Sequence, residues 1–446
     1  MPRTSRITYG QCLILGSPRP ADQSNLTNLT GMKRIQSANM GYTFARERFK
    51  QIGSPNFVGD VNITNPEIKL EMNYYYSNGT NEILLGLDVD GSQRSALFGL
   101  QRPNQSNNFY ILFGSGVNSD VLLETNNNDF QNKYNVMGLG NCFLNSYSIS
   151  AAVGQPVTVT AAVQADNMQL QRYSDATNGE LIPAIDPSTQ KPTTTNKYKI
   201  LTSSFKDTTN QDGLIESAFA PSGIRIVMPT DVNVPGLEFT GEYGDAIVNS
   251  VDVSFSIDRT ALYGFGSIYP FGRRAVMPVL GQLSFSALAT EFEHGRLHDL
   301  VILDNNTEKS FDFTINVLGA SGTTGLQLEV QGAKVDSESL SQVIGDNASI
   351  DAALSFSMSD RSGLKYSTPP LVLSQPVGQA FSGPTTNVGV VATGKSDLEY
   401  QWYNGTSNSA IGGATSSVHA ADATGLYYCL INNILGSATS NTVELT

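Results

Sequence analysis

The stretch with the greatest potential for metal chemistry runs from Glu291 to Asp299. His294 and His298 are four residues apart, so on a helix they would share one face and could offer two imidazole nitrogens to zinc, with carboxylates nearby. Gly295 lies between the two histidines, however, and the stretch follows a predicted strand. Because glycine favours a turn here, we interpret these residues as a solvated loop and predict no metal site.

A second candidate for metal binding is the acidic segment from Asp88 to Ser92. Asp88, Asp90 and Ser92 are spaced like the first ligands of a calcium-binding loop, but the later carboxylate that such a loop requires is missing at the right distance. The dipeptide Asp90-Gly91 is typical of a tight turn. The segment is therefore predicted to be a turn.

Catalytic signatures are missing from the sequence. It contains no phosphate-binding glycine motif, no H-E-x-x-H and no G-x-S-x-G, and we interpret the glycines of 137–140 and 263–266 as breaks in β segments. Asp258, Asp351 and Asp360 fall in separate predicted strands without a histidine close in sequence, so no triad can be proposed. We predict that the protein is not an enzyme and has no catalytic residue, no cofactor and no cofactor-binding residue. A polysaccharide hydrolase would instead need two carboxylates about 5–10 Å apart in one cleft.

The composition favours a mainly β protein. Charged residues are only 15% of the 446, whereas Asn, Ser, Thr and Gly are abundant and there are 18 tyrosines and 20 phenylalanines, which suits strands and turns better than helices. A net charge of −13 argues against a nucleic-acid site built from basic patches, but it is compatible with a wall that nucleic acid passes without sticking.

Location and redox state follow from simple counts. The residues after Met1 contain no apolar leader and no run approaches the roughly 18 apolar residues of a membrane span, so we expect folding in the cytoplasm. Cys12, Cys142 and Cys429 are far apart and odd in number, so neither a disulfide framework nor a zinc site is indicated.

The segment Leu144–Val163 occurs twice, the second time as Val335–Leu354, 191 positions later and without a gap. Both copies read as a strand, a turn at a glycine (Gly154 or Gly345) and a returning alternating strand. This pattern predicts the same strand-turn-strand unit in two domains, with Gly154 and Gly345 in equivalent places. Strands 157–163 and 350–356 are each expected to bury one face and to present polar residues on the other.

A second, less regular repeat precedes the first. Ile68–Tyr76 alternates as a strand, Asn78-Gly79 suits a hairpin tip, and 81–89 is predicted to be the partner strand. At an offset of 211, Tyr42 meets Val253, and after a slip of two Leu70 meets Leu283. The drop from 211 to 191 predicts an insertion of about 20 residues in the first copy, which we place at 92–108.

These patterns divide the chain into four parts. We predict a first β domain at 1–166, opening with an arm or loop to about Arg34, then a linker or long loop at 167–198 and a second β domain at 199–367, joined to a last domain at 368–446. Helix signals are few, at 128–135 and 214–220.

The last part has the pattern of an immunoglobulin-like sandwich. Trp402 lies in a predicted strand, 27 residues before Cys429, and Tyr427 stands two residues before that cysteine. No cysteine precedes Trp402 within this part; Val388 or Val390 stands where the disulfide partner would be. Cys429 is therefore expected to be a buried free thiol.

Residues 371–446, with "YQWYNG", "GLYYC" and "NNILGSATSNTVEL", resemble the Ig-like modules of phage structural proteins. With this module and the duplicated β layout, the whole chain resembles the tail tube (major tail) proteins of long-tailed bacteriophages in which two tube domains are fused. The resemblance implies that each tube domain adds strands to a continuous β-barrel around a channel. It also implies a homo-oligomeric trimeric ring with pseudo-sixfold symmetry.

The function expected from this resemblance is structural. Rings would stack into a virion tail tube, assembled in the host cytoplasm beside other tail proteins, and genome DNA would pass the lumen without specific binding. The Ig-like module would project outward and could touch host-surface glycans weakly, and the loops 92–108 and 126–135 are candidates for ring-to-ring contact. The alternatives are an adhesin or carbohydrate-binding β protein, for which Tyr74–Tyr76 could supply exposed aromatics, and a neck or tip component of the tail.

Overall fold

The computed structural model describes residues 12–17, 30–62, 65–91, 94–98, 100, 106–114, 134–172, 219–227, 245–265, 269–288, 310–319, 322–342 and 348–446. These residues are almost entirely in β-strands, and the helix among them, α1 (Thr80–Leu85), has six residues. The mainly β fold predicted from composition is confirmed. No helix in the described ranges is long and apolar enough to cross a membrane.

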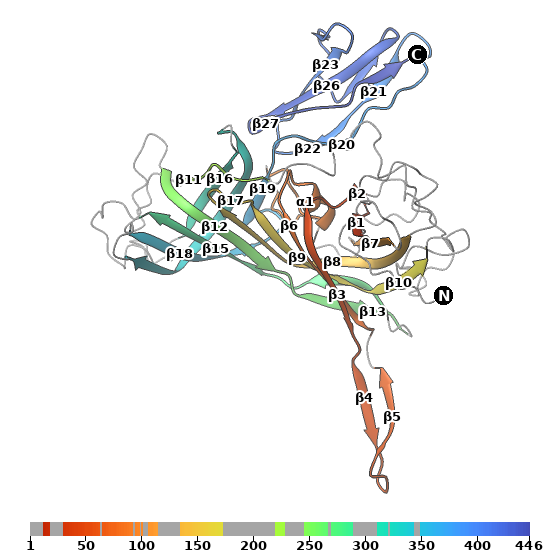
Figure 1. The fold of residues 1–446 in the computed structure, drawn as a ribbon, viewed down its shortest axis with the longest axis vertical. Helices are drawn as coiled ribbons and strands as arrows, with labels where there is room; N and C mark the ends of the chain where they lie inside the picture. The colour runs from red at the N-terminus through yellow and green to blue at the C-terminus, as the bar shows by residue number, and fades with distance from the viewer. Residues whose placement is uncertain are drawn as a thin grey trace.

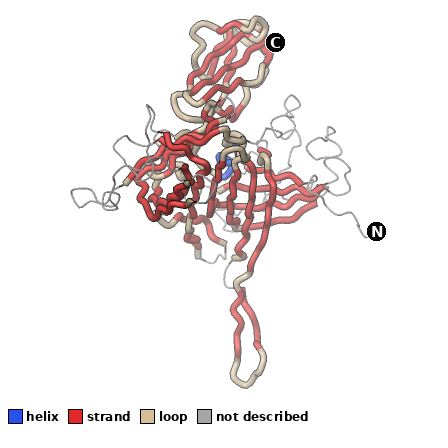
Figure 2. The backbone as a smooth tube through the Cα atoms, turned by 60° about the vertical axis from the view of Figure 1, so that its left-hand side comes forward, coloured by secondary structure: helices blue, strands red, loops and turns tan. Residues whose placement is uncertain are grey.

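The first half of the chain forms an antiparallel sheet in the order β3-β6-β9-β8-β7-β1-β2. The chain continues from β2 through residues 32–34 into β3, so the strand path returns to its starting segment and the sheet rolls up (Figures 1 and 2). The strands are β1 (Cys12–Gly16), β2 (Thr30–Gly31), β3 (Ile35–Thr43), β6 (Glu67–Tyr75), β7 (Asn107–Gly114), β8 (Tyr134–Ala152) and β9 (Thr158–Ala165).

The second half repeats this arrangement as β12-β15-β18-β17-β16-β11, and β11 also pairs with β12, which closes the path. Its strands are β11 (Gly223–Val227), β12 (Asp245–Ser256), β15 (Val279–Leu288), β16 (Phe311–Leu318), β17 (Thr324–Ser341) and β18 (Ser349–Met358). β19 (Leu364–Ser367) adds to β17, and β10 (Asn167–Arg172) adds to β8.

The two repeats share their strand registers. Ile149 faces Val159 in the first repeat, and 191 positions later Leu340 faces Ile350; in both hairpins the register shifts one pair beyond Leu144 or its counterpart Val335. The strand-turn-strand repeat therefore forms the same hairpin twice. Gly345 lies outside the described residues, so its comparison with Gly154 stays a prediction.

Strands β3 and β6 of the first repeat correspond to β12 and β15 of the second repeat, 213 positions later along their whole length. Met40 faces Leu70 and Val253 faces Leu283, and both pairs of strands have a register shift at equivalent positions. Tyr42 thus corresponds to Phe255, and the alignment of Tyr42 with Val253 was wrong by two residues. A slip of two leaves every side chain on the same face, so alternation alone could not detect it.

Each repeat also carries a two-stranded extension at the same place. β4 (Arg46–Lys50) pairs with β5 (Phe57–Asn62), and β13 (Arg259–Tyr263) pairs with β14 (Pro270–Ala275) in the same register, 213 positions later. We name residues 44–62 the arm. Figures 1 and 2 show the arm projecting from the body, at the end opposite the C-terminal module.

Three sequence predictions need correction. Residues 80–85 are helix α1, not the strand predicted at 81–89: the run Ile83-Leu84-Leu85 is apolar without alternation, and β6 already has β3 and β9 as partners. The predicted N-terminal arm contains the buried strand β1. The predicted linker begins with β10, and its remainder lies outside the described residues, as do most of 128–135 and 214–220.

The sequence distance between equivalent residues of the two repeats falls from 213 to 191 in two steps rather than one. From β7 to β16 it is 204, since Phe109 and Phe313 hold equivalent places in the sheet. The first repeat is therefore longer by nine residues between β6 and β7 and by thirteen between β7 and β8. The single insertion predicted at 92–108 was only partly right.

The C-terminal module is an immunoglobulin-like sandwich with its own core. Trp402 faces Cys429 across β23 and β26, both are fully buried, and the Tyr427 hydroxyl donates to the carbonyl of Ala423 over 2.9 Å. Cys429 is a free thiol, as predicted. The strands are β20 (Leu371–Ser374), β21 (Thr386–Gly389), β22 (Val391–Thr393), β23 (Glu399–Asn404), β24 (Ser409–Ala410), β25 (Val418–Ala421), β26 (Gly425–Asn433), β27 (Gly436–Thr439) and β28 (Val443–Leu445).

Candidate assembly interface

The feature that joins the two repeats is a strand pairing between β8 and β12. Ile149 faces Val253 and Tyr147 faces Phe255, and all four side chains are buried. Since β8 also pairs with β9 and β12 also pairs with β15, one antiparallel sheet runs through both repeats without a break. We call this pairing the junction.

The sheet across the junction has two distinct faces. One row of directly opposed residues is apolar and buried: Tyr74, Val159, Ile149, Val253, Leu283 and Leu354. The neighbouring row points to the other face and is polar: Ser37, Asn73, Thr160, Ser148, Ser254, Gln282 and Ser355. Period-two alternation thus separates a core face from a face of hydroxyls and amides.

An arginine of the second repeat fastens β13 to the first repeat. The Arg259 Nε donates to the carbonyl of Leu144 at 3.2 Å, and its Nη1 donates to the carbonyl of Leu100 at 3.0 Å. The guanidinium also lies 5.2 Å from the centre of the Phe143 ring, in a cation–π arrangement.

A buried ion pair reinforces the same contact. Arg273 in β14 donates from Nε and Nη2 to one carboxylate oxygen of Asp166, both at 2.7 Å, and the Asp166 side chain is fully buried. Burial raises the pKa of Asp166 to about 6, and the Arg273 guanidinium acts in the opposite direction.

A second polar cluster lies inside the core, where helix α1 meets both repeats. Glu82, only 1% exposed, accepts hydrogen bonds from Tyr74 (2.9 Å) and Tyr147 (3.3 Å), and Tyr147 contacts the hydroxyl of Tyr366 from the second repeat at 3.5 Å. Burial raises the pKa of Glu82 to about 7, and the two tyrosine hydrogen bonds lower it in part. The cluster is enclosed in the core, so it is a structural feature rather than a site for a substrate.

Within the described residues, the outer strands of this continuous sheet each keep one unpaired edge. β3 pairs with β6 alone, and residues 335–341 of β17 pair with β18 alone. Leu340 is 54% exposed, and so is Tyr42. Their counterparts at the junction, Ile149 and Phe255, are buried.

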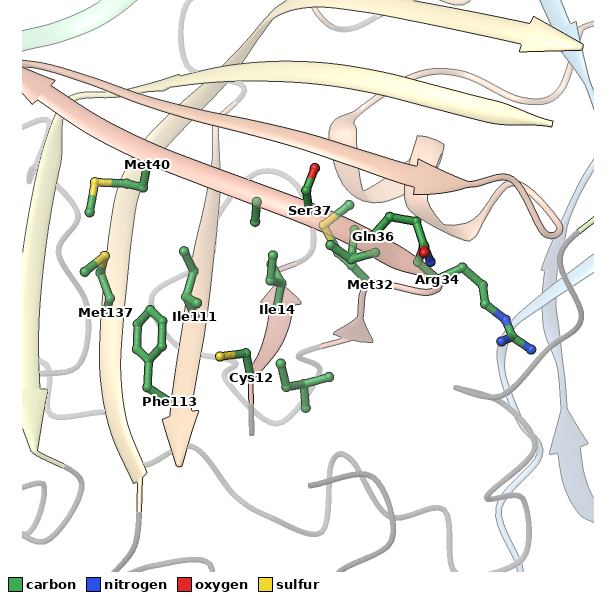
Figure 3. Close-up of a pocket in the computed structure, with 13 residues that line it drawn as sticks. Cys12, Ile14, Met32, Arg34, Gln36, Ser37, Met40, Ile111, Phe113 and Met137 are labelled. Carbon is green, nitrogen blue, oxygen red and sulfur yellow. The ribbon is translucent and has the colours of Figure 1, made fainter. Parts of the chain in front are cut away.

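An apolar cavity of about 770 Å³ opens beside β3. Figure 3 shows Met40, Met137, Ile111 and Phe113 gathered around it, with Cys12 at the end of β1. No charged cluster accompanies these side chains: Arg34 is the charged residue in the lining. The cavity thus lies along a strand whose outer edge is free.

The residues considered for chemistry are placed as follows. Residues 291–299 lie outside the described residues. The Asp90 amide donates to the Asp88 carboxylate at 3.0 Å and Gly91 has φ +64°, which is the geometry of a turn, and Ser92 lies outside the described residues. In the described part of the chain, no three His, Cys, Asp or Glu side chains lie close enough to hold a metal.

The aromatic run proposed for carbohydrate does not form a surface patch. Tyr74 and Tyr76 are fully buried and Tyr75 is half-buried. Sequence reasoning missed Glu82, Arg259 and Arg273, because a lone charged residue in a β-rich sequence has no motif to mark it. The repeat itself was the usable signal, since Arg46 and Arg259 align at an offset of 213.

No protein family profile matches the chain, and neither does any curated protein. Solved structures with similarity include the sheath-tube complex of an extracellular contractile injection system (12% identity, 33% of this chain, 88% of that chain, TM-score 0.24) and the SPP1 tail tube (14%, 37%, 80%, 0.25). Tandem Ig repeats of Dlar also match (14%, 31%, 87%, 0.16). Similarity at this level does not transfer a function to this chain.

Proposed function

We propose that this chain is a structural protein of a phage tail, whose copies join edge to edge into rings that stack as a tail tube. One observation carries the proposal: a single sheet runs through both repeats, and the edges that join them at the junction recur unpaired on β3 and β17. A free strand edge is a template for another chain, and closing a ring removes it.

The polar face of the sheet suits a channel wall for DNA. Its central row consists of hydroxyl and amide side chains, and the same face also carries the carboxylates of Glu71, Asp252 and Asp351 and the ammonium of Lys69, which pairs with Glu67 at 3.3 Å. Such a surface lacks the clustered Lys and Arg that neutralise phosphates. DNA would therefore slide past it without specific binding.

The proposed ring contains three chains and hence six repeats, as the resemblance to tail tube proteins with two fused domains implies. The repeats are taken as an internal duplication at 1–166 and 199–367, with residues 167–198 connecting them. The Ig-like module at 368–446 lies opposite the arm and would project from the tube. In that position it could bind host glycans weakly. Assembly would take place in the host cytoplasm, and the product would belong to the virion tail.

The test is negative-stain microscopy together with sedimentation of the purified chain over a range of concentrations. Annular particles or tubes, with a mass of three chains per ring, are expected. A strict monomer at high concentration, in the presence of preformed tail tips as initiators, would contradict the proposal.

A further inference from the structure

The junction inside one chain can serve as a template for the contact between two chains. β12 of the junction corresponds to β3 at an offset of 213, and β8 corresponds to β17 at an offset of 191, with all neighbouring registers kept. In the junction β12 and β8 pair with each other, whereas β3 and residues 335–341 of β17 lie at opposite ends of the sheet with open outer edges in the described structure.

We infer that the free edge of β17 in one copy pairs antiparallel with the free edge of β3 in a second copy, in the register of the junction. This inference rests on the proposed function, because it names the contact that would close the ring. The expected partners are Ala38 with Gln342, Asn39 with Ser341, Met40 with Leu340, Gly41 with Ser339, Tyr42 with Glu338 and Thr43 with Ser337.

Burial supports a second copy as the occupant. Val253 and Ile149 are 0% and 2% exposed at the junction, and their counterparts are Met40, half-buried beside the apolar cavity, and Leu340, 54% exposed. The apolar pair Val253–Ile149 of the junction thus corresponds to a second apolar pair, Met40 and Leu340. In one chain these two residues lie on different edges of the sheet. If Met40 of one copy and Leu340 of another buried each other, the contact would gain hydrophobic stabilisation at the position where the junction has its own buried apolar pair.

The arm extends the same template. Arg46 holds the place of Arg259, and the expected acceptor for its guanidinium is the carbonyl of Val335 in the next copy, the counterpart of Leu144. The arm is exposed along its whole length and displays apolar side chains that a lone chain leaves in water: Phe44, Phe49, Phe57, Val58 and Val61.

One element of the junction has no counterpart between copies. The buried pair Arg273–Asp166 maps to Asp60 and Ser357, which cannot form an ion pair. The contact between chains would therefore lack the buried ion pair that the junction has within a chain.

Cysteine cross-linking tests the register. In a chain carrying Cys12→Ser, two double variants are oxidised after assembly: Met40→Cys with Leu340→Cys, and Gly41→Cys with Ser339→Cys. Neighbouring pairs in an antiparallel ladder alternate between wide and close spacing, so at least one variant has its Cα atoms within disulfide range. Met40→Cys with Asp336→Cys is the control, because those positions would be about 13 Å apart.

Covalent dimers and trimers are expected with at least one designed pair, at about ten times the yield of the control pair. Microscopy of the same samples separates two kinds of failure. Rings that cross-link no better in the designed register than in the control overturn the inference and leave the proposed function standing. Samples without rings or tubes contradict both.

A surface variant gives an independent readout. Arg46→Ala is expected to raise the concentration needed for assembly by about tenfold, the effect of one charge-assisted hydrogen bond. Arg48→Ala is the matched control, since it removes the same charge from the same strand but corresponds to Ala261. Equal effects of the two substitutions would overturn the assignment of Arg46.

Discussion

At the scale of single residues, Glu82 is the group whose state should govern stability. It lies in the core among Tyr74, Tyr147 and Tyr366, so it ties helix α1 to both repeats. Burial makes the protonated form more favourable in the folded chain, and the pKa of Glu82 is about 7 compared with 4.5 in its ordinary state. Folding is therefore linked to proton uptake at this carboxyl.

This linkage predicts a pH dependence of a definite sign. Because the folded-state pKa is raised, the stabilisation is complete below about pH 4.5 and is lost as the pH rises through 7, up to roughly 3 kcal/mol. The difference in unfolding free energy between wild type and Glu82→Gln should thus change between pH 5 and pH 8.5. Asp166 titrates in both proteins, so it cancels in the difference. Parallel stability curves for the two proteins would refute the role of Glu82.

At the scale of elements, one pair of facing core residues has its large and small members exchanged between the two repeats. Ile68 of β6 faces Ala165 of β9, a large residue opposite a small one. The equivalent pair on β15 and β18 is Gly281 and Phe356, a small residue opposite a large one. A Cβ placed on Gly281 would come within 2.3 Å of the Phe356 ring, so the glycine is needed for the ring to fit.

The exchange of sizes predicts a specific pattern of stabilities. Gly281→Ala should lower the unfolding free energy by about 1–3 kcal/mol through overpacking. The double variant Gly281→Ile with Phe356→Ala copies the pair of the first repeat and should be more stable than the sum of its single substitutions implies. Chemical denaturation measures both effects. Strict additivity would mean that the two positions do not compensate each other.

The elements also show how far sequence reasoning reached. Alternation predicted β6, β9 and β18, and the Trp402–Cys429 spacing predicted the Ig-like sandwich, because both patterns reflect burial on one face. Helix α1 was missed, since six residues are too few for a helical period to stand out from a strand. The arm was missed as an element because it is exposed on both faces, so no buried face leaves a pattern.

The candidate interface was only partly predictable for a similar reason. The sequence repeat predicted two equivalent domains. It did not predict the strand register, because the register depends on which strands pair and a slip of two residues leaves each side chain on the same face. Only the pairing of β8 with β12 reveals that the edges of β3 and β17 are equivalent to a contact that already exists. Arg259 and Asp166 each form hydrogen bonds with residues more than 100 positions away in the sequence, and a local sequence pattern cannot predict such contacts.

At the scale of the whole molecule, the Ig-like module is attached to the body at one end. The Lys395 ammonium contacts Glu329 of β17 at 3.1 Å and also contacts Gln327, and the Ser396 backbone amide donates to the carbonyl of Asp90 at 3.2 Å. The module has a separate hydrophobic core, and neither free edge belongs to it. Assembly should therefore depend on the two repeats alone.

Deletion of residues 371–446 tests this division. The shortened chain is expected to form rings and tubes of unchanged repeat and smaller outer diameter, as seen by electron microscopy. The point variant Lys395→Ala, which keeps the module but removes its ammonium contact, serves as the control for loss of the attachment. Loss of assembly on deletion would make the module part of the contact between chains.

The most direct measurement of the central claim is a cryo-electron microscopy map of the assembled particle at a resolution that separates strands. The account predicts a sheet that passes from chain to chain without a break, with β17 beside β3 of the next copy, Met40 opposite Leu340, and the row of Ser148 and Thr160 facing the lumen. Rings held together by the Ig-like modules, or with the edges of β3 and β17 facing solvent, would contradict it.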